Sequence, residues 1–172
     1  MRNPVIRSID ILVVEDNSGD ARLIREVLND NKIFSSLFMV NDGVEAMDFL
    51  RNRGKYKKAP KPDLIILDLN LPRKDGREVL AEIKTDEVLK HIPIVIMTIS
   101  QAEEDILKSY NLHANCYITK PIDLNQFVKV VKSIEDFWFS IVKLPPKVED
   151  LDQESNGTQR QMKEKPTGFG KQ

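Results

Sequence analysis

Five short runs of apolar residues recur along the chain, and segments with helical periodicity separate them. The runs are Ile9 to Val14, Ser35 to Val40, Leu64 to Leu67, Ile94 to Met97 and Cys116 to Thr119. Strands that are buried on both faces carry continuous apolar sequence, and strands that alternate with helices form parallel sheets. The pattern therefore predicts an α/β fold built on a doubly wound, five-stranded parallel sheet.

Polar residues mark the starts of the helices between these runs. Three pairs place a capping acceptor three residues before a side chain that can reach back: Asp42 with Glu45, Ser100 with Glu103, and Asp123 with Gln126. Another helix is expected to begin near Asp20, and a weaker one to cover Arg77 to Lys84. Each of the five predicted strands is thus followed by a predicted helix.

Polar side chains also follow four of the five runs. They are Glu15 and Asp16, Asp68 and Asn70, Thr98 and Ser100, and Lys120 and Pro121. In a doubly wound sheet, ligands bind outside the carboxyl ends of the strands. Three carboxylates at one edge repel one another unless a divalent cation that prefers oxygen ligands neutralises them, which points to Mg²⁺. Lys120 adds a positive charge and Thr98 a hydrogen-bond donor, so the set suits a small oxyanion such as a phosphoryl group.

Composition narrows the classes of partner. The 172 residues include 26 basic and 27 acidic side chains, for a net charge of −1, so nothing global indicates a nucleic-acid or membrane surface. The single cysteine, Cys116, cannot form an internal disulfide, and neither a membrane span nor a secretory signal is evident. We therefore expect a cytoplasmic protein.

Domain limits follow from where apolar residues become scarce. Residues 1–146 are expected to form one domain with a core at about 9–144, and residues 147–172 a disordered tail. The basic segment 51–61 is interpreted as a solvated connection. Nothing after Leu144 has the length of a helix-turn-helix unit, so we expect no direct DNA binding and an output through an unknown downstream protein.

Four motifs together resemble the receiver domain of two-component response regulators. They are EDN at 15–17, LDLNLPRKDG at 67–76, MTIS at 97–100 and YITKP at 117–121, within a match from about Ile9 to Leu144. The resemblance implies a flavodoxin-like three-layer sandwich with strand order 2-1-3-4-5. It also implies that Asp68 accepts a phosphoryl group from a sensor histidine kinase or phosphotransfer protein. The implied Mg²⁺ ligands are Glu15, Asp16, Asp68 and the backbone carbonyl of Asn70.

The same resemblance assigns the remaining site residues. Lys120 would bind a phosphoryl oxygen, Thr98 would move toward the phosphoryl group, and Tyr117 would change rotamer with it. The bond between Lys120 and Pro121 would be cis. Such a domain is a signalling protein and not an enzyme in the usual sense, since it catalyses only its own phosphotransfer and dephosphorylation. The motifs are most similar to single-domain regulators that work with phytochromes.

Ile99 departs from the family pattern, which usually has a small residue after the switch threonine. Its bulk is expected to shield an acyl phosphate from water. Two other classes are weighed against the receiver. A haloacid-dehalogenase-type hydrolase needs a second acid two residues after the nucleophile, where this chain has Asn70. A passive fold relative, such as a flavin carrier, would not need the full set of acids, threonine and lysine.

The final helix is expected to run from Leu124 to about Leu144. A stripe at helical spacing should cover the sheet: Phe127, Val131, Ile134, Trp138 and Ile141. Phe137, Phe139 and Val142 would then point elsewhere. Because contiguous exposed apolar patches usually mark interaction sites, these three residues predict a homodimer or partner surface.

Overall fold

The computed structural model describes residues 8–30 and 35–147. Its strands are β1 (Ile9–Val14), β2 (Ser35–Val40), β3 (Leu64–Leu67), β4 (Ile94–Thr98) and β5 (Cys116–Thr119). Its helices are α1 (Ser18–Asn29), α2 (Gly43–Leu50), η1 (Gly54–Tyr56, a 3-10 turn), α3 (Gly76–Thr85), α4 (Glu103–Asn111), α5 (Leu124–Glu135) and η2 (Asp136–Ile141, a π-helix). None of the helices in these two ranges is long and apolar enough to cross a bilayer. Apart from Lys147, the tail expected at 147–172 lies outside the described residues.

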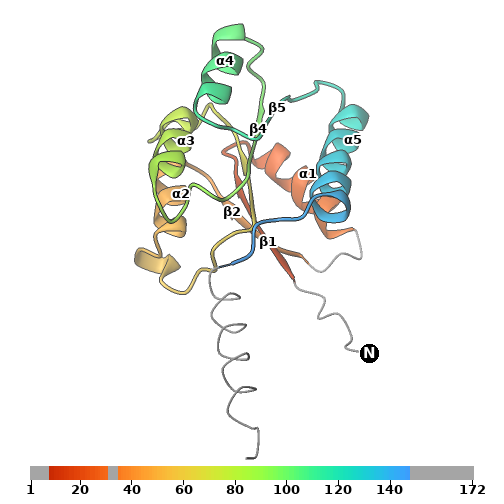
Figure 1. Ribbon diagram of the computed structural model, residues 1–172. Coiled ribbons are helices and arrows are strands. Elements are labelled where there is room, and N and C mark those ends of the chain that lie inside the picture. Colours follow the sequence, from red (N-terminus) through yellow and green to blue (C-terminus); the bar gives the residue numbers. More distant parts are fainter. Residues whose placement is uncertain (1–7, 31–34, 148–172) are drawn as a thin grey trace, which may run out of the picture.

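The five strands form one parallel sheet in the order β2-β1-β3-β4-β5, which confirms the expected topology. Helices α1 and α5 lie side by side on one face, and α2 and α3 cover the other (Figure 1). Helix α4 packs near β5, at the edge of the sheet. The domain is therefore the expected three-layer, flavodoxin-like sandwich.

Alternate residues of the central strands enter different layers of the core. In β1, Leu12 and Val14 pack toward α2 and α3, whereas Ile11 and Val13 pack toward α1 and α5. Strands β3 and β4 alternate in the same way and are buried along their whole length. Because neither face of these strands meets water, no position favours a polar residue, and the sequence reads as an unbroken apolar run.

Side-chain caps fix where several helices begin. Asp42 and Asp123 accept hydrogen bonds from backbone amides three residues further on, at 2.8 and 2.9 Å, as predicted. Asp75 and Glu78 form a complete capping box. The Asp75 side chain accepts a hydrogen bond from a backbone amide of the first turn, and the Glu78 side chain accepts one from the backbone amide of Asp75. This box starts α3 at Gly76, directly after the turn that follows β3.

The predicted cap of α4 is wrong. Ala102 occupies the cap position without a side-chain hydrogen bond, and the hydroxyl of Ser100 instead donates to Asp105 at 2.6 Å. The Ser100 oxygen accepts from the amide of Ala102 at 3.4 Å, and the helix begins only at Glu103, so Ser100 lies before the cap position. The only buried residue of α4 is Ser109, whose hydroxyl has no hydrogen-bond partner among the described residues, while Leu107 is exposed. Helix α4 is thus weakly embedded.

The final helix is shorter than predicted and changes pitch near its end. Helix α5 gives way to η2, which ends at Ile141 and not at Leu144. The stripe from Phe127 to Trp138 is buried as predicted, but Ile141 is 72% exposed. A π-helix has more residues per turn than an α-helix, so positions extrapolated from α-helical spacing rotate. Phe139 and Val142 consequently pack against the layer of α1 and α5, and of the predicted surface Phe137 alone remains exposed.

Residues 142–147 run from η2 along the edge of the sheet where the strands begin (Figure 1). Lys147 places its ammonium nitrogen 2.5 Å from a carboxylate oxygen of Asp10 and 3.5 Å from one of Asp63. The amide of Asp10 in turn donates to the Asp63 carboxylate at 2.9 Å. This segment is therefore attached to the domain at the edge opposite the candidate site.

The basic segment 51–61 is more ordered than a solvated connection. Tyr56 packs its ring against Phe49, with centroids 5.2 Å apart. The amide group of Asn52 donates to the carbonyl oxygens of Tyr56 and Ala59 at 3.2 and 2.6 Å. These contacts hold the segment against α2, although most of its basic side chains are exposed.

Candidate functional site

The site starts where strands β1, β3 and β5 end, and the sheet itself positions its main residues. The amides of Glu15 and Asp68 donate to carbonyl oxygens at the ends of β2 and β1, at 3.0 and 3.1 Å. The amide of Lys120 donates to the carbonyl of Thr98 at 2.7 Å. Because these bonds continue the sheet ladder, the three side chains project from rigid backbone and not from free loops.

Three carboxylates and one ammonium group meet at this edge. One oxygen each of Glu15, Asp16 and Asp68 lie within 4.8 Å of one another. The ammonium nitrogen of Lys120 lies 2.8 Å from Asp68 Oδ2 and 2.5 Å from Glu15 Oε2. Glu15, Asp68 and Lys120 are almost fully buried, whereas Asp16 is exposed. Buried carboxylates need a positive partner, and Lys120 supplies it.

The ionisation of the buried residues reflects this crowding. Burial raises the pKa of Glu15 to about 7, although Lys120 partly opposes the shift. Burial alone would lower the pKa of Lys120, but its hydrogen bonds to Asp68 and Glu15 outweigh burial and raise that pKa. Lys120 is therefore a permanent cation at neutral pH. The donor set of carboxylate oxygens fits a hard divalent cation such as Mg²⁺.

Thr98 lies at the end of β4 and is fully buried, and the hydrogen bonds of its hydroxyl are long. Its oxygen accepts from the amide group of Asn70 at 3.4 Å and from the backbone amide of Ser100 at 3.5 Å. Both distances are at the long end of hydrogen bonding. The backbone amide of Asn70 also donates to Asp68 Oδ1 at 3.1 Å. Thr98 is thereby linked to Asp68 through Asn70, by contacts that can be exchanged at low cost.

A polar network extends from this threonine toward α4. The hydroxyl of Tyr117 in β5 donates to the carbonyl of Ser100 at 3.0 Å, and the Ser100 hydroxyl donates to Asp105. Arg77 of α3 holds the Asp105 carboxylate with two hydrogen bonds of 2.8 and 2.6 Å, and also contacts Asp75. The hydrogen bonds from Arg77 and Ser100 lower the pKa of Asp105 to about 2. The network therefore joins the start of α3, the start of α4 and β5.

Two glycines allow the turn after Asp68 to pack closely. A Cβ atom on Gly76 would lie 2.1 Å from the carbonyl oxygen of Asp68, and one on Gly43 would lie 2.2 Å from the carbonyl oxygen of Lys74. Any larger residue at either position would clash with backbone that cannot rotate away. Gly76 thus belongs to the structural support of the Asp68 backbone.

The peptide bond between Lys120 and Pro121 was expected to be cis, and this expectation is wrong. All peptide bonds of the described residues are trans. The trans form is intrinsically favoured before proline by about 0.5–1 kcal/mol. Lys120 reaches Glu15 and Asp68 with this geometry, so the contact does not require a cis bond.

Comparison with known families identifies this arrangement. The model of the response regulator receiver domain matches residues 11–132 of the chain. The chain belongs to this family. The match runs from within β1 to within α5 and includes the strand ends that carry the carboxylates.

Individual receiver-domain proteins are similar over most of the chain. Response regulator Rcp1 of Synechocystis sp. is 52% identical over 135 residues, which is 78% of this chain and 92% of Rcp1. The crystal structure of Mn²⁺-bound Rcp1 has a TM-score of 0.79 at 51% identity, covering 80% of this chain and 99% of that one. The phosphorylated cyanobacterial phytochrome response regulator RcpA has a TM-score of 0.79 at 53% identity, covering 81% of this chain and all of that one. The resemblance to phytochrome-associated regulators is confirmed.

The receiver domain brings most of the predicted site residues together. The residues that share the edge are Glu15, Asp16, Asp68, Asn70, Thr98 and Lys120. Tyr117 lies next to them, at the loop after β4, whereas Phe137 is exposed on η2. The sequence interpretation missed Asp20, which lies on α1 and contacts Lys120 at 3.0 Å. A fourth acid one helical turn after EDN was the available signal.

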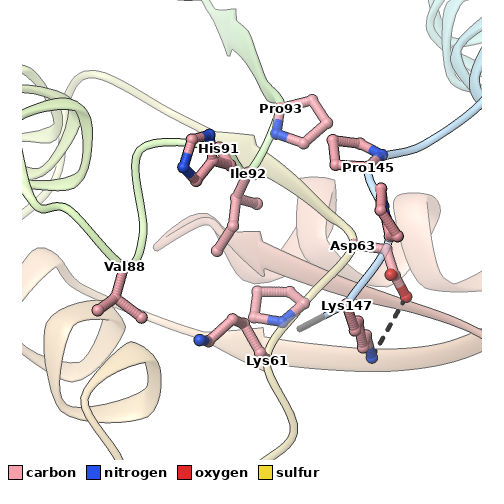
Figure 2. A pocket seen from close by; sticks show the side chains of 10 residues that line it. Lys61, Asp63, Val88, His91, Ile92, Pro93, Pro145 and Lys147 are labelled. Atoms are coloured by element: carbon pink, nitrogen blue, oxygen red, sulfur yellow. Dashed lines mark ion pairs between the residues drawn. The ribbon is translucent and has the colours of Figure 1, made fainter. Parts of the chain in front are cut away.

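A separate pocket of about 370 Å³ lies at the opposite edge of the receiver domain (Figure 2). Its walls include His91, Ile92 and Pro93 before β4, and Pro145 after η2. The ion pair between Asp63 and Lys147 borders it, as Figure 2 shows. Its residues precede β3 and β4 or follow η2, and none of them belongs to the carboxylate edge, so this pocket is separate from the candidate site.

Proposed function

We propose that this receiver domain accepts a phosphoryl group on Asp68 from a sensor histidine kinase or phosphotransfer protein, in a reaction that depends on Mg²⁺. The observation that carries the proposal is the place of the Asp68 carboxylate. It lies 2.8 Å from the Lys120 ammonium nitrogen and close to the carboxylates of Glu15 and Asp16. Phosphoryl transfer needs mainly positioning and charge stabilisation, and this arrangement supplies both.

In the proposed reaction, an oxygen of Asp68 forms a bond to phosphorus while the phosphorus–nitrogen bond of the donor phosphohistidine breaks. The imidazole leaves with the electron pair of that bond. Mg²⁺ held by Glu15, Asp16, Asp68 and the backbone carbonyl of Asn70 would screen the charge of the phosphoryl oxygens. Lys120 neutralises charge from the other side, and its raised pKa keeps it protonated throughout.

Two similar proteins support the proposals that this domain binds a divalent metal ion and that its partner is a sensor kinase. Rcp1 has been solved with Mn²⁺ bound, and RcpA in its phosphorylated form as a phytochrome response regulator. By similarity, the proposed donor is a histidine kinase of the phytochrome type. The proposed place of action is the cytoplasm, where a free thiol such as that of Cys116 stays reduced.

The proposed signal is a change of surface near α4 and β5. Within the described part of the chain, the Thr98 hydroxyl has two long hydrogen bonds to give up if it turns toward a phosphoryl oxygen. Ser100 follows it in the chain and carries the contacts to Tyr117 and Asp105. A shift of this loop therefore reaches both β5 and α4, which a downstream protein would recognise.

We also propose a homodimer through the end of the last helix. Phe137 is 48% exposed and Ile141 is 72% exposed on consecutive turns of η2. Exposed apolar side chains that lie together commonly mark a self-association surface. Phe139 and Val142 anchor η2 to the domain, because they pack against the core.

The central experiment measures intact mass after incubation with acetyl phosphate and Mg²⁺. The wild type should gain one phosphate, and Asp68→Asn should gain none. Asp30→Asn, which removes an exposed acid from the end of α1, is the matched control and should behave as the wild type. A phosphate that persists in Asp68→Asn, or its absence from the wild type, would contradict the proposal.

A further inference from the structure

The ammonium group of Lys120 is held by three carboxylates. Its nitrogen lies 2.5 Å from Glu15 Oε2, 2.8 Å from Asp68 Oδ2 and 3.0 Å from Asp20 Oδ2. An ammonium group has three N–H donors, so each donor has one carboxylate acceptor. The Lys120 side chain is 4% exposed. Asp20 therefore completes the hydrogen bonding of a buried cation.

Helix α1 fixes the position of Asp20. Asn17 caps this helix, and its side-chain oxygen accepts a hydrogen bond from the backbone amide of Asp20 at 3.0 Å. Asp20 lies in the first turn, where the helix dipole favours a negative side chain. The carboxylate reaches Lys120 from the rim of the site, since its side chain is 27% exposed. Glu15 and Asp68 approach the same nitrogen from the buried side.

Asp20 differs from the other two acceptors of Lys120 because it is not one of the carboxylates that could bind a metal ion. Glu15 and Asp68 belong to the group of carboxylates that could hold a metal ion, together with Asp16. Asp20 does not belong to that group, within the part of the chain that the structure describes. A cation held by Glu15 and Asp68 would draw on their carboxylate oxygens and weaken their hydrogen bonds to Lys120. Asp20 would keep its contact with the ammonium group.

We propose that Asp20 is a positioning residue that retains the Lys120 ammonium beside Asp68 when Glu15 and Asp68 bind the metal ion. Without Asp20, the remaining carboxylate partners of the buried ammonium group among the described residues are Glu15 and Asp68, so the ammonium group competes with the cation for them. The inference rests on the proposed function, because it assigns the metal to those carboxylates. It extends the site to a residue on α1, 100 residues from Lys120 in sequence.

The test uses Asp20→Asn in the full chain and in a Lys120→Gln background. Calorimetric titration with Mg²⁺ measures affinity, and intact mass over time measures phosphorylation by acetyl phosphate. Because a hydrogen bond between charged groups is lost, Asp20→Asn should weaken Mg²⁺ binding by about 10-fold. Phosphorylation should slow by a similar factor. Asp20→Glu, which keeps the charge, should recover most of both, and Glu26→Gln on the exposed side of α1 should change neither.

The Lys120→Gln background separates positioning from a general field effect. In that background, Asp20→Asn should change Mg²⁺ affinity by less than about 2-fold, as an exposed charge would. An equal loss in both backgrounds would overturn the proposal, because Asp20 would then act on the cation directly. No loss in either background would overturn it as well. If the wild type binds Mg²⁺ but is not phosphorylated, the proposed function fails while the Mg²⁺ titrations still decide on Asp20.

Discussion

Replacing Gly76 with alanine tests whether close packing against the turn sets the position of Asp68. The added Cβ would lie 2.1 Å from the carbonyl oxygen of Asp68 and 2.6 Å from the Cα atom of Leu69. Both are backbone atoms in a buried turn, so the chain must move apart by roughly 1 Å to relieve the overlap. Overpacking of this kind costs about 1–3 kcal/mol.

A second cost arises if the hydrogen bond from the Gly76 amide to Leu69, at 2.8 Å, is stretched. Its loss would add about 1 kcal/mol. The higher helix propensity of alanine returns at most about 1 kcal/mol. The expected net loss is therefore about 1–3 kcal/mol of unfolding free energy, measured by urea denaturation at pH 7 with an unchanged slope.

The same displacement should impair the site. A shift of about 1 Å in a reacting group can cost on the order of 100-fold in rate, so phosphorylation of Gly76→Ala by acetyl phosphate should slow by at least about 10-fold. Gly54→Ala is the matched control, because Gly54 has φ +55° and open space around its Cβ position. It should lose about 1 kcal/mol to backbone strain and keep its phosphorylation rate.

Two results would refute this reasoning. Gly76→Ala could lose less than about 0.5 kcal/mol, which would mean that the turn relaxes freely. Alternatively, it could be destabilised as expected and still be phosphorylated at the wild-type rate. In that case the contact between Gly76 and Asp68 stabilises the fold without setting the geometry of the site.

Three further predictions concern other parts of the domain. Ile99→Ala should speed loss of phosphate from the phosphorylated protein, followed by intact mass over time; an unchanged or slower decay would contradict the shielding role of this 68% exposed side chain. Phe137→Glu should shift the sedimentation of a wild-type dimer toward monomer, and a wild type that stays monomeric at high concentration would remove the dimer. Asp105→Asn should cost about 1 kcal/mol at pH 7 after allowance for solvent screening, because the pKa of Asp105 is lowered to about 2. This stabilisation is present above the ordinary pKa near 4 and is lost as pH falls through about 2, so an equal difference between wild type and variant down to pH 2 would exclude the ion pair with Arg77 as its source.

The strands and the buried acids could be predicted because both depend on short-range sequence. A strand buried on both faces leaves an unbroken apolar run, and the residue that follows it is carried to the carboxyl edge of the sheet. Glu15, Asp68 and Lys120 all follow such runs directly. Asp20 could not be found in this way, since it reaches the site from the first turn of a helix and contacts a residue 100 positions away.

Errors arose where a helix began later than its capping pattern indicated or where the helix changed pitch. Ser100 matched a capping pattern, but α4 begins at Glu103 with Ala102 at the cap position, and the Ser100 hydroxyl donates to Asp105. The apolar pattern of the last helix was extrapolated at α-helical spacing, whereas η2 turns Ile141 outward and Val142 toward the core. Neither outcome can be predicted from local sequence periodicity, because each depends on tertiary contacts.

The weak embedding of α4 has a consequence for how the domain opens. This helix has one buried residue, Ser109, and no side-chain cap, while Leu107 and Tyr110 are 64% and 50% exposed. Little apolar surface would be given up if α4 separated from the sheet, so the free energy of its local opening lies far below that of global unfolding. The ion pair between Arg77 and Asp105 then contributes a large share of what keeps its first turn in place. In amide hydrogen exchange, we therefore expect α4 to open as a cooperative unit of its own, distinct from the unit that contains β1, β3 and β4.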